Sequence, residues 1–219
     1  MAIIPQQTFF VWSEIENLGD LERLNLVLEY MPDEELMREL EKERRNGRDD
    51  YPVRAMWNSI LAGIVYQHPS IESLRRELLR NGQLRFMCGF RKGKVPGAYV
   101  YTRFIKKLFE KEEKINGMFN KLVDQLEELL PGFGKNLAID GKAITSLAKG
   151  ENKNREEDGR RDLDANWGIK EYKGIREDGT AWSKVVKWFG YRLHLIVDAD
   201  YELPVAYEVT RASASEVKQ

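Results

Sequence analysis

The first half of the chain carries apolar residues at helical spacing. Four leucines recur every three or four positions: Leu18, Leu21, Leu24 and Leu28. That period predicts one face of an α-helix. Residues 33–50 begin with acids and end with bases, as a helix macrodipole favours. Residues 51–68 are apolar almost all round, which predicts a buried helix, and Ser70 is placed to cap a further helix over residues 70–81.

A second apolar stripe follows a Gly-Lys-Pro turn. Its members lie at helical spacing: Val100, Phe104, Ile105, Leu108, Ile115, Phe119, Leu122, Leu126 and Leu129. They predict one long amphipathic helix after a short helix near residue 82. Pro131 to Gly134 then marks the clearest domain boundary. We therefore expect a helical domain over residues 1–131.

Beyond this boundary the hydrophobic period changes to two, which predicts strands. We expect strands over residues 136–144, 188–199 and 203–210, the last two joined by the turn "DADYE". The polar stretch 146–186 predicts a long loop or insertion, whose last residues favour a further strand. The chain as a whole is therefore expected to be α+β, with the strand-rich domain over residues 132–219.

Composition narrows the class of protein. Hydrophobic residues make up 42% of the 219 residues, enough for a core, and charged residues make up 32%. Cys88 is the sole cysteine, which excludes an intrachain disulfide and a zinc site built on cysteines and fits a reducing cytosol. The N-terminus lacks the basic start of a signal peptide, and no apolar run approaches the ~20 residues of a membrane span. A cytoplasmic location is expected.

Charge is distributed unevenly along the chain. The net charge is −1, yet residues 1–50 carry a net −7, and residues 75–111 hold 11 basic and 2 acidic side chains, a net +9. Ten of these cations are candidate DNA contacts: Arg75, Arg76, Arg80, Arg85, Arg91, Lys92, Lys94, Arg103, Lys106 and Lys107. Cations on short helices with a tight turn are typical of a helix-turn-helix. The alternative is a solvated charged face.

Asp140 stands at what the pattern predicts to be the end of a half-buried strand, "NLAIDGKAI". Carboxylates in this position hold ligands in open α/β sheets and suit Mg²⁺, which prefers oxygen ligands. The alternative is a turn acid that supports Gly141. Two-metal phosphoryl transfer needs two or three converging carboxylates, so Asp140 alone is part of a site.

Asp198 and Asp200 are the nearest candidate partners, although acids at a hairpin turn are ordinary. Alternation places Asp198 and His194 on one face of their strand, where His194 is more easily a core or supporting residue than a metal ligand. Trp167 and Trp182 lie in the polar insertion. Aromatic side chains there are candidates for stacking on bases.

Two segments resemble bacterial insertion-sequence transposases. "SIESLRRELLRNGQLRFMCGF" followed by "VPGAYVYTRFIKKL" resembles their N-terminal helical domain. "LAIDGKAI" and "WFGYRLHLIVDADYELPVAYEVTRASASE" resemble the first half of their DDE catalytic domain. The motifs occur in the order of the family and cover most of the chain from residue 50 onward.

This resemblance implies an RNase H-like catalytic domain that is incomplete in this chain. Asp140 matches the first catalytic, metal-binding aspartate, whereas the second Asp and the Glu would lie after residue 219. Mg²⁺ is the implied cofactor of a complete enzyme, with Lys142 and His194 as candidate supporting residues near the ions.

Double-stranded DNA at the terminal repeats of the element is the implied partner, together with a second copy or a full-length transposase. A nucleoid-associated location follows from that partner. The resemblance leaves three roles open: a piece of a DDE enzyme that is inactive alone, a non-catalytic DNA-binding regulator of transposition, and an inactive remnant.

Overall fold

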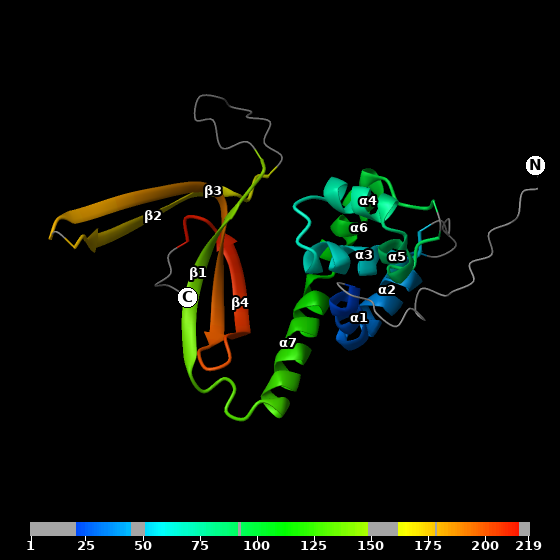
Figure 1. Cartoon of the computed structure of the whole chain (residues 1–219), viewed down its shortest axis with the longest axis horizontal. Coiled ribbons are helices and arrows are strands. Elements are labelled where there is room, and N and C mark those ends of the chain that lie inside the picture. The colour runs from blue at the N-terminus through cyan, green and yellow to red at the C-terminus, as the bar shows by residue number, and fades with distance from the viewer. Residues whose placement is uncertain (1–20, 45–50, 92, 149–161, 178, 215–219) are drawn as a thin grey trace, which may run out of the picture. The chain divides into compact units, whose positions relative to one another are not determined.

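The computed structural model describes residues 21–44, 51–91, 93–148, 162–177 and 179–214. The chain divides into two compact units, residues 1–122 and 123–219. Helices form the first and a sheet dominates the second, which agrees with an α+β class (Figure 1). None of the helices in these ranges combines the length and hydropathy that a membrane span requires.

The helical unit follows the apolar pattern closely. In the described ranges its helices are α1 (Leu21–Tyr30), α2 (Glu34–Arg44), α3 (Val53–Val65), α4 (Ile71–Arg80), α5 (Gly82–Met87), α6 (Ala98–Phe109) and α7 (Glu112–Leu129), the last of which continues into the second unit. The predicted cap is confirmed, because the hydroxyl of Ser70 accepts a hydrogen bond from the N–H of Ser73 at 3.2 Å. Asn81 starts α5 in the same way, with Leu84 as donor.

The prediction of one long helix through Val100 and Leu129 is wrong. α6 ends at Phe109 and α7 begins at Glu112. At the break, the N–H of Lys111 bonds to Leu108 O, three residues back, instead of continuing the helical pattern. The Lys111 ammonium there lies 2.6 Å from Glu39 and 2.5 Å from Glu43. The apolar spacing continues across the break, so it could not reveal this contact with α2.

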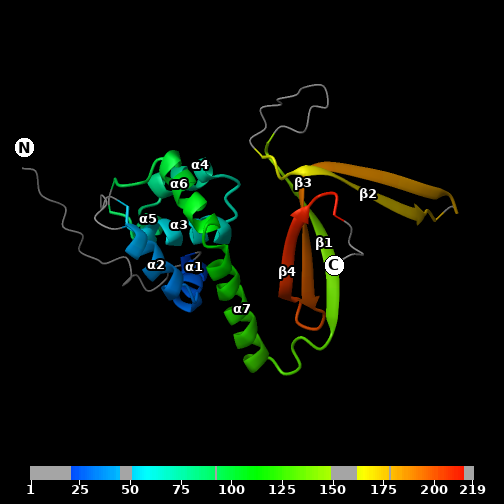
Figure 2. The ribbon, with the colours of Figure 1, turned by 180° about the vertical axis from the view of Figure 1, so that it is seen from behind.

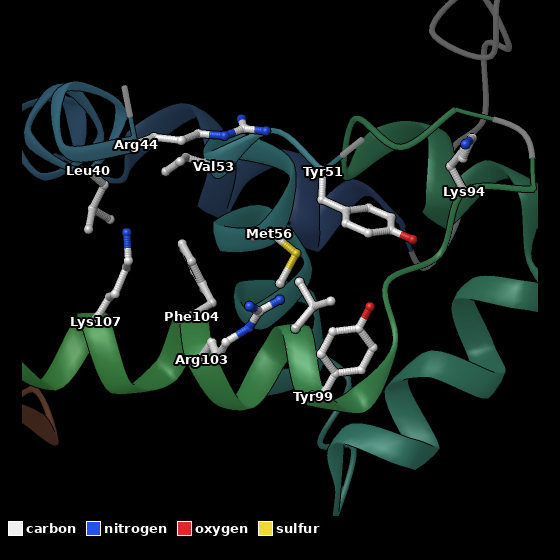
Figure 3. Close-up of a pocket in the computed structure, with 11 residues that line it drawn as sticks. Leu40, Arg44, Tyr51, Val53, Met56, Lys94, Tyr99, Arg103, Phe104 and Lys107 are labelled. Carbon is white, nitrogen blue, oxygen red and sulfur yellow. The ribbon is translucent and has the colours of Figure 1, made fainter. Parts of the chain in front are cut away.

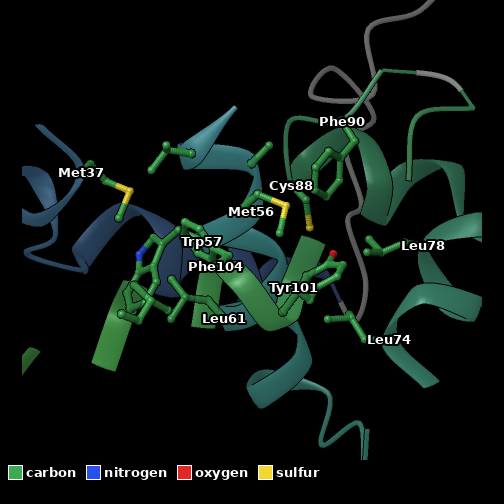
Figure 4. Packing of buried hydrophobic residues seen from close by; sticks show 14 of the residues in the cluster. Met37, Met56, Trp57, Leu61, Leu74, Leu78, Cys88, Phe90, Tyr101 and Phe104 are labelled. Carbon is green, nitrogen blue, oxygen red and sulfur yellow. The ribbon is translucent and has the colours of Figure 1, made fainter. Parts of the chain in front are cut away.

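A single apolar cluster fills the helical unit (Figure 4). Leu24, Leu78 and Leu84 are fully buried, and each buried leucine contributes roughly 1.5–3 kcal/mol. Tyr101 lies in the same core, and its hydroxyl forms a hydrogen bond with Ser59 Oγ at 2.9 Å. Burial raises the pKa of Tyr101 to about 12, so the phenol remains neutral.

The sheet unit is organised around one long central strand, β3 (Ala181–Asp198). Its second half pairs antiparallel with β1 (Leu137–Thr145) on one edge and β4 (Leu203–Arg211) on the other. Its first half pairs with β2 (Asn166–Ile175) alone among the described strands. Those two segments form a two-stranded ribbon that projects from the three-stranded part (Figures 1 and 2).

Gly190 makes the junction between ribbon and sheet possible. It pairs with Thr145 of β1 and with Asn166 of β2. Its φ is +151°, and a Cβ at this position would lie 2.1 Å from Ile144 O. A side chain therefore cannot be accommodated, which is the situation that selects glycine.

The prediction of a long loop over residues 146–186 is wrong in the described part of that stretch. Residues 166–175 form β2, and residues 181–186 begin β3 as a continuous strand. The further strand favoured at the end of this stretch is confirmed, but it is not separate from the next one. Residues 149–161 lie outside the described ranges.

The predicted boundary at Pro131 to Gly134 is a turn held against the β3–β4 hairpin. The N–H of Gly134 donates to the Asp198 carboxylate at 2.7 Å, and Tyr201 Oη donates to Pro131 O at 3.0 Å. Phe133 packs its ring beside that of Tyr201 at 6.1 Å. This turn therefore lies in the sheet unit and fixes the start of β1.

Candidate nucleic-acid interface

A cleft of about 620 Å³ opens in the helical unit. Side chains of α2, α3 and α6 and two connecting segments converge on it (Figure 3). The lining residues are Leu40, Arg44, Tyr51, Val53, Met56, Lys94, Tyr99, Val100, Arg103, Phe104 and Lys107. Four of these described residues are cations and none is an acid. A lining that contributes four cations attracts anions.

Helix α6 supplies half of the polar lining residues. Tyr99, Arg103 and Lys107 recur every four residues and so share one face of the helix, which points into the cleft (Figure 3). Gly97 precedes the helix, and a Cβ there would lie 2.9 Å from the Tyr99 ring. The ring lies against this glycine, and the Arg103 guanidinium sits 5.2 Å from the ring centroid. That cation–π contact orients the guanidinium.

Three acidic side chains of α2 pair with lysines outside the cleft lining. Lys111 bridges Glu39 and Glu43, and Lys114 pairs with Glu35. Hydrogen bonding to Lys111 lowers the pKa of Glu39, and hydrogen bonding to Lys114 lowers that of Glu35. These three carboxylates of α2 are thus engaged by Lys111 and Lys114, beside and within the first turn of α7.

Three of the ten predicted DNA contacts line the cleft: Lys94, Arg103 and Lys107. Two others make hydrogen bonds inside the helical unit. Arg75 Nε donates to Pro96 O at 2.6 Å, and Arg85 donates to Leu78 O at 2.8 Å and to Leu79 O at 3.0 Å at the end of α4. These two guanidinium groups order connections between helices.

The remaining predicted cations lie outside the cleft lining. Arg76 bonds to Glu72 O at 3.3 Å, and Arg80 donates to Glu77 at 2.5 Å. Arg91 and Lys106 are exposed. Lys92 lies outside the described residues. The structure therefore separates cations that converge on one cavity from cations spread over α4 and its surroundings.

Asp140 lies in the middle of β1 and is exposed, so its predicted place at the end of a half-buried strand is wrong. The strand continues past Gly141, which pairs with His194. The Asp140 carboxylate accepts a hydrogen bond from the Gly141 N–H at 2.8 Å. Lys142 lies two residues further and therefore projects on the same face as Asp140.

Asp198 lies on the face opposite Asp140. It pairs with Leu137, three residues before Asp140, and an odd step along a strand reverses the face. Asp198 is fully buried and accepts hydrogen bonds from three N–H groups: those of Gly134, Asp200 and Tyr201. Burial raises the pKa of this carboxyl, yet the three donors outweigh burial and hold it below its usual range. This is a turn acid.

The other candidate partners of Asp140 also make contacts elsewhere. His194 projects on the opposite face from Asp140, and its Nε2 lies 2.9 Å from Thr210 Oγ1. Asp200 accepts a hydrogen bond from Asn136 at 2.7 Å.

A Mg²⁺ site is not assembled by the described residues. No group of three His, Cys, Asp or Glu side chains among them could hold a metal ion. Asp140 is bordered on its face by Leu195, with which it pairs, and by Lys142. A leucine supplies no ligand atom and a lysine is a cation, so this donor set does not fit Mg²⁺.

Residues 12–107 match the family model described as "Transposase domain (DUF772)". This match supports a transposase relationship and a transposition-related function. Comparisons with curated proteins and with solved structures gave no match. The matched segment contains every residue that lines the cleft.

Sequence reasoning missed three polar residues of the cleft in this transposase-like segment: Arg44, Tyr51 and Tyr99. Arg44 lies in residues 1–50, whose net charge is negative, so this arginine was not considered as a candidate contact. A signal was present, since Leu36, Leu40 and Arg44 recur every four residues and so continue one stripe of α2. Tyr99 could have been found from its spacing to Arg103 on α6.

Proposed function

We propose that the chain is a transposition protein that binds double-stranded DNA at insertion-sequence ends through the cationic cleft of its helical unit. The observation that carries this proposal is the convergence of Arg44, Lys94, Arg103 and Lys107 on one cavity whose described lining has no acid. The match of the same segment to a transposase domain supports the choice of DNA over other polyanions.

The chemistry of the cleft suits a phosphate backbone. Arginine can bind a phosphate with two parallel N–H donors, and Arg103 is already oriented by Tyr99. Lys107 lies one turn further along α6 and supplies a flexible point charge. Each phosphate that these cations neutralise releases condensed counterions, so binding should weaken steeply with salt.

Paired charge variants test this proposal. Arg103→Gln combined with Lys107→Gln removes two cleft cations, and Arg76→Gln combined with Arg80→Gln removes two exposed cations of α4. Both double variants lower the net charge equally. Fluorescence anisotropy of a labelled DNA duplex should show about tenfold weaker binding for the cleft variant and a change below about threefold for the α4 variant. Equal losses, or no loss in the cleft variant, would contradict the proposal.

A DDE transposase would cut and join DNA with two Mg²⁺ ions, and Asp140 would be the candidate for one carboxylate of such a site. The described residues do not provide the other ligands. This observation favours a second candidate function, a DNA-binding regulator of transposition that is not itself catalytic. A plasmid-nicking assay with Mg²⁺ or Mn²⁺ separates the two. We expect no nicking by this chain, and nicking that Asp140→Asn abolishes would reject the regulator.

A further inference from the structure

The β2–β3 ribbon carries two chemically different faces. One face presents Trp182, Lys184, Val186 and Trp188 of β3 opposite Gly174, Tyr172, Lys170 and Gly168 of β2. We call it the tryptophan face. The other face presents Ser183, Val185, Lys187 and Phe189 opposite Lys173, Glu171, Ile169 and Trp167. Paired residues of an antiparallel ribbon project on the same side, so the register alone separates these sets.

The Trp182 indole packs against a glycine on the tryptophan face. A Cβ on Gly174 would meet indole Nε1, Cε2 and Cζ2 of Trp182 at 2.6, 2.8 and 2.9 Å. These three adjacent ring atoms form the edge of the indole that packs against the glycine. The side chain keeps an exposed fraction of 38%. The indole is therefore held against the ribbon while part of it remains accessible.

Trp188 makes a similar contact with a glycine and is covered by further groups. A Cβ on Gly168 would lie 2.5 Å from Trp188 Cζ2, and the Arg192 guanidinium lies 5.3 Å from the ring. Trp188 is only 7% exposed. Trp188 is thus an indole of this ribbon that packs against a glycine and has a guanidinium over its ring. Trp182 offers the same kind of surface in an accessible place.

The charges of the tryptophan face complement phosphate. Lys170 and Lys184 are its charged residues within the paired positions, and Lys170 Nζ lies 5.6 Å from the ring of Tyr172. Glu171, the acid within the paired strands, projects on the opposite face, where it lies 3.2 Å from Lys173. The tryptophan face thus combines accessible aromatic rings with cations and has no acid among its paired residues.

We propose that the tryptophan face binds unpaired nucleotides of DNA. A base stacks on Trp182, and the flanking phosphates contact Lys184 and Lys170. Accessible rings interleaved with cations are the surface that single-stranded nucleic acid recognises. An intact duplex covers both π-faces of its internal bases by stacking, so a flat indole gains little from it. This site adds to the cationic cleft and does not depend on it.

Binding of a labelled oligo(dT) strand to the whole chain tests this inference. Trp182→Ala should weaken binding about tenfold, and Trp182→Phe, which keeps an aromatic ring, should retain affinity within about threefold. Lys184→Gln should weaken binding about threefold. Its matched control is Lys187→Gln, the same charge change on the opposite face, which should leave affinity unchanged. The comparison of Lys184→Gln with Lys187→Gln tests the inference even if Trp182→Ala disturbs the ribbon.

Three outcomes would overturn the inference: no binding of oligo(dT) by the wild-type chain, equal losses for Lys184→Gln and Lys187→Gln, or an equal effect of Trp182→Phe and Trp182→Ala. The cleft variant Arg103→Gln with Lys107→Gln distinguishes this site from the cleft. If it loses duplex binding but keeps oligo(dT) binding, both sites stand. If oligo(dT) binding instead depends on the cleft and not on Trp182, the ribbon site is rejected while the cleft proposal stands.

Discussion

The helical unit and the sheet unit differ in how far particular apolar side chains are buried. Leu24 and Leu78 are fully buried in the helical core, whereas Ile139 of β1 and Ile175 of β2 are 75% and 77% exposed. In the sheet unit a polar side chain, Asp198, is fully buried. Burial of apolar area stabilises the helices, while hydrogen bonds to the Asp198 carboxylate hold the hairpin turn of the sheet.

This difference bears on how the two proposed binding surfaces are recognised. In the helical unit one apolar cluster forms the core, and the distribution of charge identifies the proposed binding surface, namely the cationic cleft. In the sheet unit aromatic and aliphatic side chains remain accessible. There the pairing of Trp182 with Gly174 identifies the surface, and charge alone would have missed it.

The largest expected effect contrasts one core residue with one exposed strand residue. Leu78→Ala should lower the free energy of unfolding of the helical unit by about 2–5 kcal/mol, because it opens a cavity in a fully buried site. Ile139→Ala should change stability by less than about 0.5 kcal/mol, because its side chain is already in solvent. Urea unfolding followed by helical circular dichroism and by tryptophan fluorescence measures both. Similar losses would remove the contrast between the units.

A second prediction concerns two adjacent carboxylates that contact the same arginine. Asp33 is 3% exposed and accepts hydrogen bonds from Arg54 and from Trp57 Nε1, each at 2.5 Å. Asp33→Ala should cost about 1–3 kcal/mol, because the buried Trp57 N–H loses its acceptor. Glu34 also binds Arg54, at 2.7 Å, but is exposed.

The matched control is Glu34→Ala, which should cost less than about 1 kcal/mol, as exposed ion pairs do. Urea midpoints of the two variants give the comparison. A loss in Glu34→Ala equal to that in Asp33→Ala would show that the ion pair with Arg54, and not the buried acceptor, holds α3 in place.

The smallest expected effect is a pH dependence in the sheet unit. The pKa of Asp198 is lowered in the folded chain, since its three N–H donors favour the charged form. Its contribution to stability is therefore complete above the ordinary aspartate pKa of 3.8 and is lost as the pH falls through the lower folded value. Hydrogen exchange at Asp200 and Tyr201, whose N–H groups donate to Asp198, should accelerate in that acid range relative to Asp198→Asn. Identical pH profiles of the two proteins would contradict this account.

The sequence predicts the elements whose stability is local. Helix α3 and the capped start of α4 follow from apolar spacing and from Ser70, because these signals act within one turn of the chain. The break between α6 and α7 could not be predicted, since Lys111 contacts Glu39 and Glu43, about seventy residues away in the chain. An apolar stripe that continues across the break contains no trace of that contact.

Strand β2 was not predicted because it too depends on contacts with another part of the chain. Gly168 and Gly174 interrupt it, and glycine is unfavourable within a strand. Trp188 and Trp182 of the partner strand cover these two glycines, and that compensation exists only once the strands are paired. The position of Asp140 was misjudged because Gly141 suggested the end of the strand, whereas pairing with His194 carries the strand onward.

The cleft shows the same limit at the level of the site. Lys94, Arg103 and Lys107 were among the predicted cations, but ten candidates gave no indication of which ones converge. Arg44 joins them from an acidic segment. Net charge over a stretch of sequence says how many cations are present, whereas the fold decides which of them share a cavity.

The salt dependence of duplex DNA binding tests the central claim most directly. The slope of log affinity against log salt counts the phosphates that the protein neutralises. For Arg103→Gln with Lys107→Gln, the slope should become shallower by about two compared with the wild type. For Arg76→Gln with Arg80→Gln it should stay close to the wild-type value. A cleft variant with the wild-type slope would show that DNA does not enter the cleft and would contradict the account.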